Sequence, residues 1–251
     1  MIRIGIIGCG RILAAHLRGY RLLREAGVDD FQITALCSRK ARDAEMYVDR
    51  GSEIEQRPAV STMPGDPLAV GDEYLSDFQP NVDVAVYTDY RELIASGKVD
   101  AINDYTIHSL HHLIAAESFS RNLHLMSQKP LAVTMLAGAQ MCDQAEAADR
   151  VFGVFENARY APANRHLKWA IEAGLLGRPQ LLLMGNVGTW WTPNRIVANT
   201  PWRHTKLEAG GISLDLGVHH FNAARYLAGE VATVQGQVSI QEPRRYEFTA
   251  D

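Results

Sequence analysis

The sequence predicts an α/β fold: an N-terminal doubly wound parallel sheet, followed by an α+β domain with an open and incomplete sheet. Three observations predict it. The chain opens with a buried-strand pattern, a glycine turn and a helix within residues 1–16. Short apolar segments then alternate with helical patterns up to residue 157, and from residue 158 that alternation stops. We therefore expect two domains, 1–157 and 158–251.

The first strand and its turn suit a dinucleotide. Ile2–Ile7 is the near-continuous apolar run that a doubly covered parallel strand shows. Gly8 permits a tight turn, and Gly10 has no Cβ to obstruct a ligand. A helix that begins after such a turn presents backbone N–H groups to a pyrophosphate. The third position of the G-x-G-x-x-G pattern is Leu13 rather than a small residue, so a glycine-rich turn without a ligand is the alternative.

The end of the second strand, expected at 32–37, decides which dinucleotide fits. An Asp or Glu there would bind the ribose 2′-hydroxyl of NAD, whereas small polar and basic residues accommodate the 2′-phosphate of NADP. Ser38 and Arg39 follow this strand and favour NADP over NAD. Asp29 and Asp30 stand about 20 residues from the glycines, but they precede the strand and so belong to the opposite edge of the sheet.

The rest of the first domain continues the alternation. Its first helix ends near residue 26, and further helices are expected at 40–49, 90–96 and 134–149. Residues 106–112 are expected to form the turn into another helix, which ends near residue 120. Further strands are expected at 84–87, 99–105, 122–126 and 151–156. Right-handed crossovers between such strands give an open, six-stranded parallel sheet. The stretch 51–81 carries four prolines and no sustained period, and we interpret it as an insertion or lid-like loop of open role.

The second domain has fewer regular patterns. We expect helices at 162–173 and 214–227 and strands at 180–187 and 231–240, with an irregular, tryptophan-rich stretch at 188–203. A sheet of only two strands would leave an open edge and much exposed apolar surface. Either further strands follow residue 251, which would make the chain a fragment, or a partner covers this face.

The totals exclude several classes of protein. The 251-residue chain is 47% hydrophobic and 22% charged, and its net charge of −4 gives no electrostatic footprint for nucleic acid or an anionic membrane surface. No apolar run approaches the roughly 20 residues of a membrane span, and no signal-peptide pattern opens the chain. The three scattered cysteines form no C-x-x-C pair, which predicts reduced thiols. We expect a cytoplasmic protein.

Three residues are candidates for chemistry. Lys129 follows a central strand, at the edge where open α/β sheets bind ligands, and could orient a nicotinamide ribose or donate a hydrogen bond to a reacting oxygen. Asp215 and His219 are spaced i, i+4 and would share one helix face. A histidine there could take a proton from an alcohol, with the aspartate orienting the ring or binding a substrate hydroxyl. The alternatives are a surface lysine and a structural polar pair.

A metal site is disfavoured. His108, His111 and His112 cluster in the sequence, but no acidic or thiolate third ligand stands at a suitable spacing. We therefore expect no metal.

Several segments, in order, carry a resemblance to a known family. They are Gly8-Cys9-Gly10, Tyr87–Tyr90, Thr106–His111 in place of T-P-N-x-x-H, Gln128-Lys129-Pro130 in place of E-K-P, Glu156-Asn157 with Arg159-Tyr160, Trp202-Arg203, and Gly210-Gly211 leading to Asp215–His219. Together they resemble the glucose–fructose oxidoreductase, inositol dehydrogenase and MocA family, Gfo/Idh/MocA. The resemblance runs from residue 2 to about residue 238.

The resemblance implies an NAD(P)-dependent oxidoreductase that acts on a sugar, polyol or related hydroxy compound. It implies a Rossmann domain, and a second domain whose open sheet serves in homo-oligomerisation. It makes Lys129, His219 and Asp215 the catalytic residues, and Arg159, Arg203 and Asp215 the substrate-binding residues. The residues expected to bind the cofactor are Gly8, Gly10, Arg11, Ile12, Ser38, Arg39, Thr106, His108, His111, Gln128 and Lys129.

The sequence departs from the family pattern at Leu13, Ile107 and Gln128, the last of which replaces a glutamate. Two other interpretations stay open. One is a dinucleotide-binding sensor or regulator without turnover. The other is an NAD-dependent glycoside hydrolase or lyase, which oxidises and re-reduces its sugar. The fold alone separates none of these readings.

Overall fold

The computed structural model describes residues 1–62, 66, 68–185, 191–197, 200–240, 242–244 and 246. The chain forms two compact units, Met1–Phe155 and Glu156–Asp251. The first unit contains every strand of the described part of the chain, and the second is built from helices and irregular segments.

The first unit is built on a six-stranded parallel sheet in the order β3-β2-β1-β4-β5-β6. Its strands are β1 (Ile2–Ile7), β2 (Phe31–Cys37), β3 (Ala85–Tyr87), β4 (Ala101–Asp104), β5 (His124–Gln128) and β6 (Phe152–Phe155). The chain winds outward from β1 in one direction and then from β4 in the other, so that the order reverses between these two strands. The predicted doubly wound sheet is confirmed.

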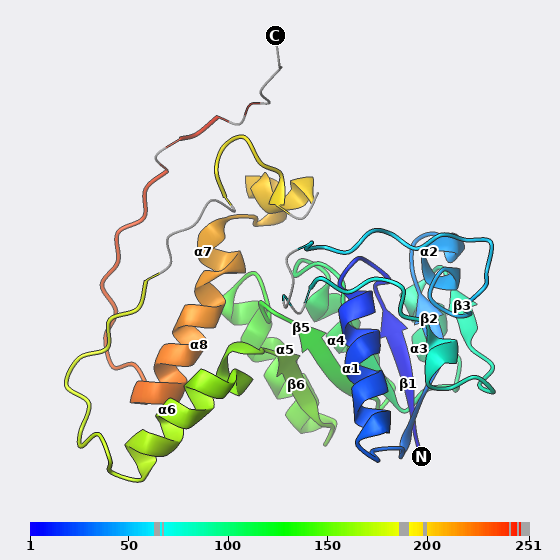
Figure 1. Cartoon of the computed structure of the whole chain (residues 1–251), viewed down its shortest axis with the longest axis horizontal. Helices are drawn as coiled ribbons and strands as arrows, with labels where there is room; N and C mark the ends of the chain where they lie inside the picture. Colours follow the sequence, from blue (N-terminus) through cyan, green and yellow to red (C-terminus); the bar gives the residue numbers. More distant parts are fainter. Residues whose placement is uncertain are drawn as a thin grey trace. The chain divides into compact units, whose positions relative to one another are not determined.

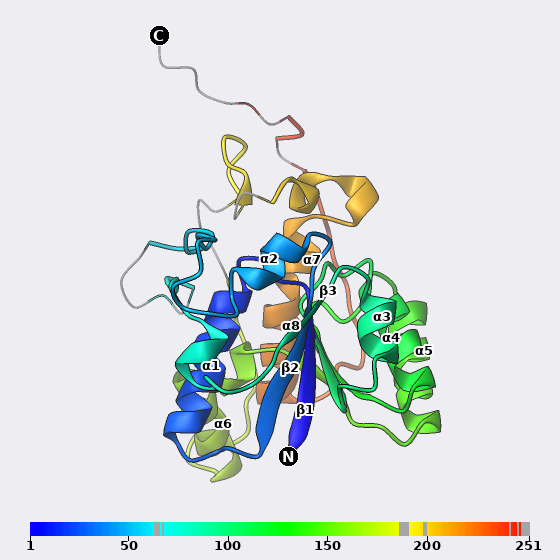
Figure 2. The ribbon, with the colours of Figure 1, turned by 90° about the vertical axis from the view of Figure 1, so that its right-hand side faces the viewer.

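Helices cover both faces of this sheet (Figures 1 and 2). They are α1 (Leu13–Glu25), α2 (Ala41–Glu45), α3 (Tyr90–Ala95), α4 (His111–Ser120) and α5 (Met135–Ala147). Asp89 and Thr134 cap α3 and α5, each accepting a backbone N–H of the first turn. The predicted turn after β4 precedes α4, and in this turn the Asp104 carboxylate accepts the Thr106 N–H.

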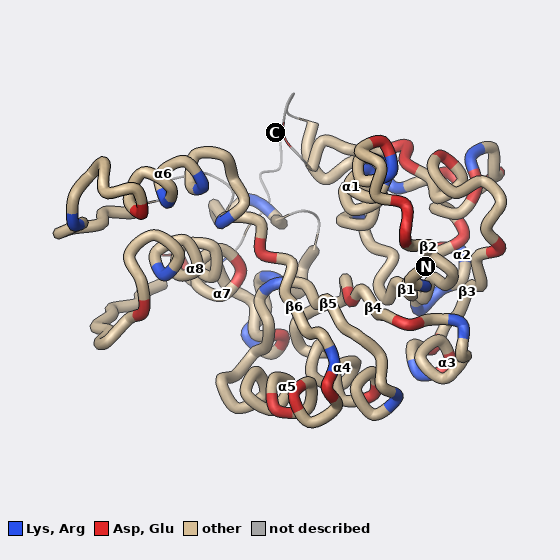
Figure 3. Tube along the Cα trace, turned by 90° about the horizontal axis from the view of Figure 1, so that it is seen from below, with Lys and Arg blue, Asp and Glu red and all other residues tan. Residues whose placement is uncertain are grey.

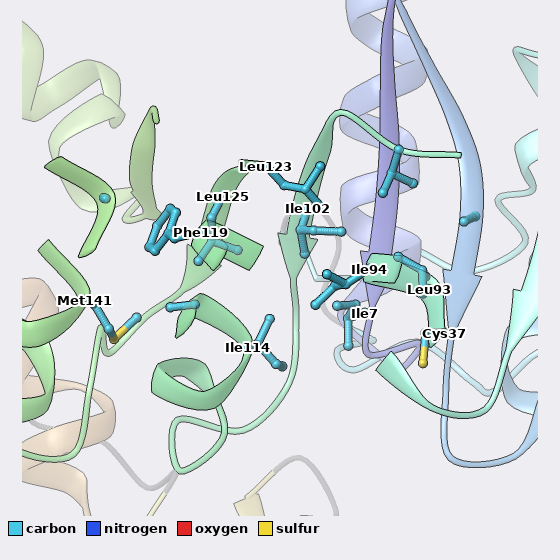
Figure 4. Packing of buried hydrophobic residues seen from close by; sticks show 14 residues of the cluster. Ile7, Cys37, Leu93, Ile94, Ile102, Ile114, Phe119, Leu123, Leu125 and Met141 are labelled. Carbon is cyan, nitrogen blue, oxygen red and sulfur yellow. The ribbon is translucent and has the colours of Figure 1, made fainter. Parts of the chain in front are cut away.

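Alternate residues of each strand point to opposite faces, which divides the core in two. Ile6 and Leu36 pack with α1 and α2 in one cluster, whereas Ile7 and Cys37 pack with α3, α4 and α5 in the other. Figure 4 shows the second cluster. The two clusters explain why the strands of this unit are apolar on both sides.

The stretch 51–81 belongs to the first unit. Its regular part is a 3-10 helix, η1 (Leu75–Asp77). Val70 and Leu75 are buried in the core cluster that packs against α1 and α2, here called the α1 cluster. Arg50 forms ion pairs with Asp72 and Asp77. The insertion is therefore packed on the domain rather than being a linker.

The second unit contains α6 (Pro162–Glu172), α7 (Ile212–Asp215) and α8 (Gly217–Ala228), with 3-10 helices η2 (Ala158–Tyr160), η4 (Pro201–His204) and η5 (Lys206–Glu208). The prediction of a single helix at 214–227 is wrong, because an interruption at Leu216 divides this segment into α7 and α8. Tryptophans 191 and 202 of the predicted irregular stretch are described, and Trp190 lies outside the described residues.

The two strands predicted in the second unit are also wrong as far as the structure describes them. Residues 180–185 and 231–240 form no strand, and 186–187 lie outside the described residues. Exposure still alternates along the first of these segments: Leu181 and Leu183 are 76% and 84% exposed, Leu182 and Met184 39% and 43%. Side-chain exposure thus alternates with the period of two that a strand has, but no neighbouring strand pairs with these segments in the described part of the unit. The sheet expected to serve in homo-oligomerisation is thus absent from the described residues.

Candidate functional site

The glycine turn after β1 leaves no room for a side chain at its first position. Gly8 has a φ of 101°, and its N–H donates to the Cys37 carbonyl at 2.9 Å. A Cβ on Gly8 would lie 2.7 Å from the Tyr105 carbonyl carbon. A Cβ on Gly10, by contrast, would meet nothing within 4 Å. The turn therefore requires glycine at one position for the fold, and at the other leaves open space of the kind a cofactor phosphate occupies.

The departure at Leu13 has a structural explanation. Its side chain is completely buried and packs with Cys9, Ile6 and Leu36 between α1 and the sheet. A leucine here fills volume that a small residue would leave empty. Ile12 packs against the same cluster, and neighbouring Arg11 is partly exposed beside the turn.

The end of β2 carries no acidic residue. Ser38 is half-buried and donates its N–H to the Tyr87 carbonyl at 3.1 Å, and Arg39 is exposed. Asp30 lies at the start of β2, where its carbonyl accepts the Ile2 N–H. This places Asp29 and Asp30 at the opposite edge of the sheet, as the topology required.

The loops after β4 and β5 are tied together by a buried histidine. His111 has no exposed surface; its Nδ1 lies 3.1 Å from the Pro130 carbonyl oxygen and its Nε2 3.3 Å from that of Thr106. His108 is buried as well. Burial raises the pKa of the nearby Asp104 carboxyl, and the hydrogen bonds from Thr106 oppose that rise. His111 thus braces the segments that carry Thr106 and Lys129, and its ring is enclosed by protein.

Gln128 ends β5 and is bonded to a histidine of α1. Its Nε2 lies 2.7 Å from the Nε2 of His16, whose ring stacks on Tyr105 with centroids 4.0 Å apart. Burial lowers the pKa of His16 to about 4. A neutral ring accepts the hydrogen bond that the Gln128 amide donates. The glutamine that stands in place of the family's glutamate therefore has a hydrogen-bond partner in this chain. Half-buried Lys129 follows, joined to Pro130 by a cis peptide bond.

The candidate cofactor residues of the first unit therefore collect at one edge of the sheet. Gly8 and Gly10 follow β1, Ser38 follows β2, Thr106 follows β4 and Lys129 follows β5. All these strands are parallel, so the residues share the carboxyl edge, where the order of the sheet reverses between β1 and β4.

In the second unit Asp215 and His219 do not form the predicted pair on one helix. Asp215 ends α7 and binds Arg203, with Oδ2 to Nε at 3.1 Å. Arg203 also donates to Thr200 Oγ1 at 2.5 Å and stacks 4.4 Å from the Trp202 ring centroid. Arg203 and Asp215 thus hold each other. The helical path is interrupted at Leu216, so Asp215 lies on a different helix from His219.

The partner of His219 is Glu156, which sequence reasoning missed. Its Oε1 lies 2.7 Å from His219 Nδ1 and accepts the Ala158 N–H at 2.8 Å, and its side chain is 7% exposed. An acid at the carboxyl end of a predicted strand was the available signal, since ligand sites lie at strand ends. Among the described residues no other hydrogen bond to the His219 ring is found, so its Nε2 is left for a ligand.

Arg159 is held by protein. Its Nε and Nη2 both donate to Asn222 Oδ1, at 3.1 and 2.7 Å, and its guanidinium lies 5.4 Å from the Tyr226 ring centroid. The two arginines expected to bind substrate, Arg159 and Arg203, are therefore both anchored on α7 or α8.

The described residues contain no group of three His, Cys, Asp or Glu side chains that could hold a metal ion. Histidines 108, 111 and 112 gather no acidic or thiolate ligand there. None of the helices that the structure describes is both long enough and apolar enough to cross a membrane.

Comparison with known proteins decides the family. A model of the oxidoreductase family with an NAD-binding Rossmann fold matches residues 2–156, and a model of the Gfo/Idh/MocA C-terminal domain matches residues 164–251. The chain belongs to the Gfo/Idh/MocA family. The resemblance read from its motifs is confirmed, and the first unit is the NAD-binding Rossmann domain of that family.

Several relatives are named as dehydrogenases of sugars or polyols. The chain is 25% identical over 229 residues to the myo-inositol 2-dehydrogenase of Thermotoga maritima, covering 91% of this chain and 55% of that protein. It is 31% identical over 161 residues to the levoglucosan dehydrogenase of Pseudarthrobacter phenanthrenivorans, covering 63% and 40%. The chain thus spans about half the length of these relatives.

Solved structures agree on the fold. An oxidoreductase from Thermotoga maritima superposes with a TM-score of 0.64 at 26% identity, covering 91% of this chain and 60% of the other. An oxidoreductase from Agrobacterium radiobacter, crystallised with NAD+, L-tartaric acid and magnesium, gives a TM-score of 0.65 at 20% identity, covering 92% and 56%.

Proposed function

We propose that this protein is an NAD(P)-dependent oxidoreductase that transfers a hydride between a nicotinamide cofactor and a hydroxyl-bearing carbon of a sugar or polyol. The observation that carries the proposal is the glycine turn, where Gly8 is required by the backbone packing of Tyr105 and Gly10 faces open space. An open turn at the reversal of a Rossmann sheet is where a pyrophosphate binds. The names of the relatives support the substrate class.

We further propose that NADP is preferred over NAD. Ser38 and Arg39 follow β2, and no acidic residue stands there to bind a ribose 2′-hydroxyl. Exposed Arg39 offers a guanidinium to a 2′-phosphate, which it can bind through two N–H groups. The other proposed contacts are those of Arg11, Ile12, Thr106 and Gln128, with His108 and His111 supporting the loops from within.

The proposed chemistry assigns roles to Lys129, His219, Glu156 and Asp215. When bound, the nicotinamide supplies or accepts the hydride. Lys129 donates a hydrogen bond to the substrate oxygen and polarises it. His219 exchanges the hydroxyl proton through Nε2, while Glu156 holds Nδ1. Asp215, fixed by Arg203, accepts a hydrogen bond from a substrate hydroxyl.

The test begins with cofactor. Titration of the chain with NADPH and NADH, followed by nicotinamide fluorescence, should show tighter binding of NADPH, and Ser38→Asp should reverse the order because a carboxylate repels the 2′-phosphate. Equal binding of both nucleotides by wild type and variant would contradict the preference. Failure to bind either nucleotide would contradict the proposed function.

Turnover is then measured on a panel of sugars and polyols. Lys129→Met should lower turnover at least a hundredfold while changing cofactor affinity little. Lys98→Met is the matched control, because Lys98 is exposed and precedes β4, at the opposite edge of the sheet. Cofactor binding without turnover across the panel would favour the sensor, and release of a glycosidic leaving group without net NADH would favour the hydrolase.

A further inference from the structure

The insertion 51–81 reaches the glycine turn through one arginine. The insertion passes the amino end of α1, where the turn lies (Figures 1 and 2). Arg57 Nη1 donates to the Cys9 carbonyl oxygen at 2.8 Å. Cys9 is the middle residue of the Gly8-Cys9-Gly10 turn, so a residue almost fifty positions away in the chain fixes the backbone of the proposed phosphate site.

The guanidinium is itself held in place. Arg57 Nη2 lies 2.6 Å from Asp43 Oδ1, on α2, and the side chains of Arg57 and Asp43 are 32% and 25% exposed. From the same side Tyr47, almost completely buried, donates its hydroxyl to the Gly10 carbonyl at 3.1 Å. Two successive carbonyls of the turn are thus bound by side chains. Because both carbonyls are engaged, the turn is held in one backbone conformation.

Helix α1 has no cap of its own at this end. Its first turn contains no acidic residue, and its N-cap residue, Ile12, makes no side-chain capping hydrogen bond. An uncapped N-terminus beside a fixed turn is suited to receive a negative charge from outside the protein. The surrounding charge has both signs, with Arg39, Lys40 and Arg42 close in sequence to Asp43; acidic and basic residues mix throughout the region of α1 and α2 (Figure 3).

The insertion does not need Arg57 in order to stay attached. Buried Val70 and Leu75 pack on the α1 cluster, and Arg50 binds Asp72 and Asp77 at 2.8 and 2.7 Å. Gln56 Nε2 donates to the Glu73 carbonyl at 2.7 Å. Because these contacts anchor the insertion, the bridge from Cys9 through Arg57 to Asp43 serves the turn rather than the insertion.

We propose that Arg57 is a positioning residue for the cofactor: it holds the Cys9 carbonyl and thereby the turn conformation that receives the pyrophosphate, and it couples the insertion to cofactor binding. This rests on the proposed function. Arginine suits the task because its planar fork reaches a carbonyl and a carboxylate at once, whereas a lysine is a single point donor. Both NADH and NADPH carry the pyrophosphate, so both depend on Arg57.

The test compares Arg57→Met, Arg57→Lys and Arg50→Met with the wild-type chain. Arg57→Met should weaken NADPH and NADH alike by roughly tenfold, which is the scale of one lost charge-assisted hydrogen bond. Arg57→Lys should recover part of that loss. Arg50→Met is the matched control, since it removes an arginine that pairs with the insertion away from the turn, and it should leave both affinities unchanged.

A second readout separates positioning from stability. In the wild type, cofactor should slow hydrogen exchange both in the turn, 8–12, and in the insertion, 54–62; in Arg57→Met the protection of the insertion should be lost. Thermal unfolding shows whether each variant is folded. If Arg57→Met is not folded, hydrogen exchange is compared between the wild type and Arg57→Lys. Protection of the insertion in the variant would overturn the coupling.

The outcomes distinguish the two proposals. If the wild type binds and Arg57→Met and Arg57→Lys bind equally well, the role of Arg57 is overturned and the proposed function stands. A loss confined to NADPH would also overturn it, since the shared pyrophosphate would not be what the turn positions. If the wild type binds neither nucleotide, the proposed function and this inference fail together.

Discussion

Half-buried His219 and buried Glu156 form a pair, with Nδ1 and Oε1 2.7 Å apart. The acid lies directly after β6 and the histidine in the first turn of α8, 63 positions later. A carboxylate on Nδ1 favours the tautomer with its proton there, which makes Nε2 the atom that can take a proton from an alcohol. The contact with His219 that the i, i+4 spacing had suggested for Asp215 is made by Glu156.

Glu156→Gln tests this relationship. A glutamine can turn its amide NH₂ toward Nδ1 and stabilise the other tautomer, so turnover on a sugar or polyol substrate should fall by about 10- to 100-fold with cofactor affinity unchanged. The measurement is kcat beside a nicotinamide titration. Asp215→Asn is the comparison, and it should raise KM for substrate more than it lowers kcat. Unchanged kcat in Glu156→Gln would show that the pair is structural.

The two glycines of the turn should separate folding from binding. Gly8→Ala places a Cβ 2.7 Å from the Tyr105 backbone at a φ of 101°, so we expect a loss of more than about 2 kcal/mol of unfolding free energy. Gly10→Ala meets no atom within 4 Å and should leave stability within about 1 kcal/mol, yet weaken NADPH at least tenfold. Urea unfolding and fluorescence titration of both variants measure this. A stable Gly8→Ala would show that the turn can relax.

Leu13, at the third position of the glycine pattern, is predicted to be a core residue. Leu13→Ala should cost about 2–4 kcal/mol, because the completely buried side chain leaves a cavity between α1 and the sheet. Leu22→Ala on the same helix is the control; Leu22 is 51% exposed, and its loss should cost less than about 1 kcal/mol. Similar midpoints for the two variants in urea would contradict this account.

The first unit could be predicted because its signals are local. Apolar strand patterns, capping residues such as Asp89 and Thr134, and the glycine turn each report on neighbouring residues, and together they specify the order of elements. The carboxyl edge of the sheet then follows from topology, which is why Lys129 and Ser38 could be assigned to it. The turn before α4 could be predicted as well, and there the Asp104 carboxylate accepts the Thr106 N–H.

The second unit could not be predicted in the same way. The alternation of Leu181–Met184 is a strand pattern, but a strand exists only where a neighbour supplies hydrogen bonds. The pairing of Glu156 with His219 joins residues 63 positions apart within the second unit, and no local sequence pattern encodes it. The same holds for Arg57, whose partners Cys9 and Asp43 precede it by 48 and 14 positions.

His16 should make the stability of the chain sensitive to acid. Burial lowers its pKa from 6.5 to about 4, so between these values the unfolded chain binds a proton that the folded chain does not. The contribution of His16 to the unfolding free energy is therefore constant above pH 6.5 and decreases as the pH falls toward 4. At pH 4 the unfolding free energy is lower by about 3 kcal/mol. His16→Phe keeps an aromatic ring against Tyr105 and has no proton to bind. The unfolding free energy of wild type relative to His16→Phe, measured in urea at several pH values, should therefore decline from pH 7 to pH 4, and a constant difference would show that His16 titrates normally.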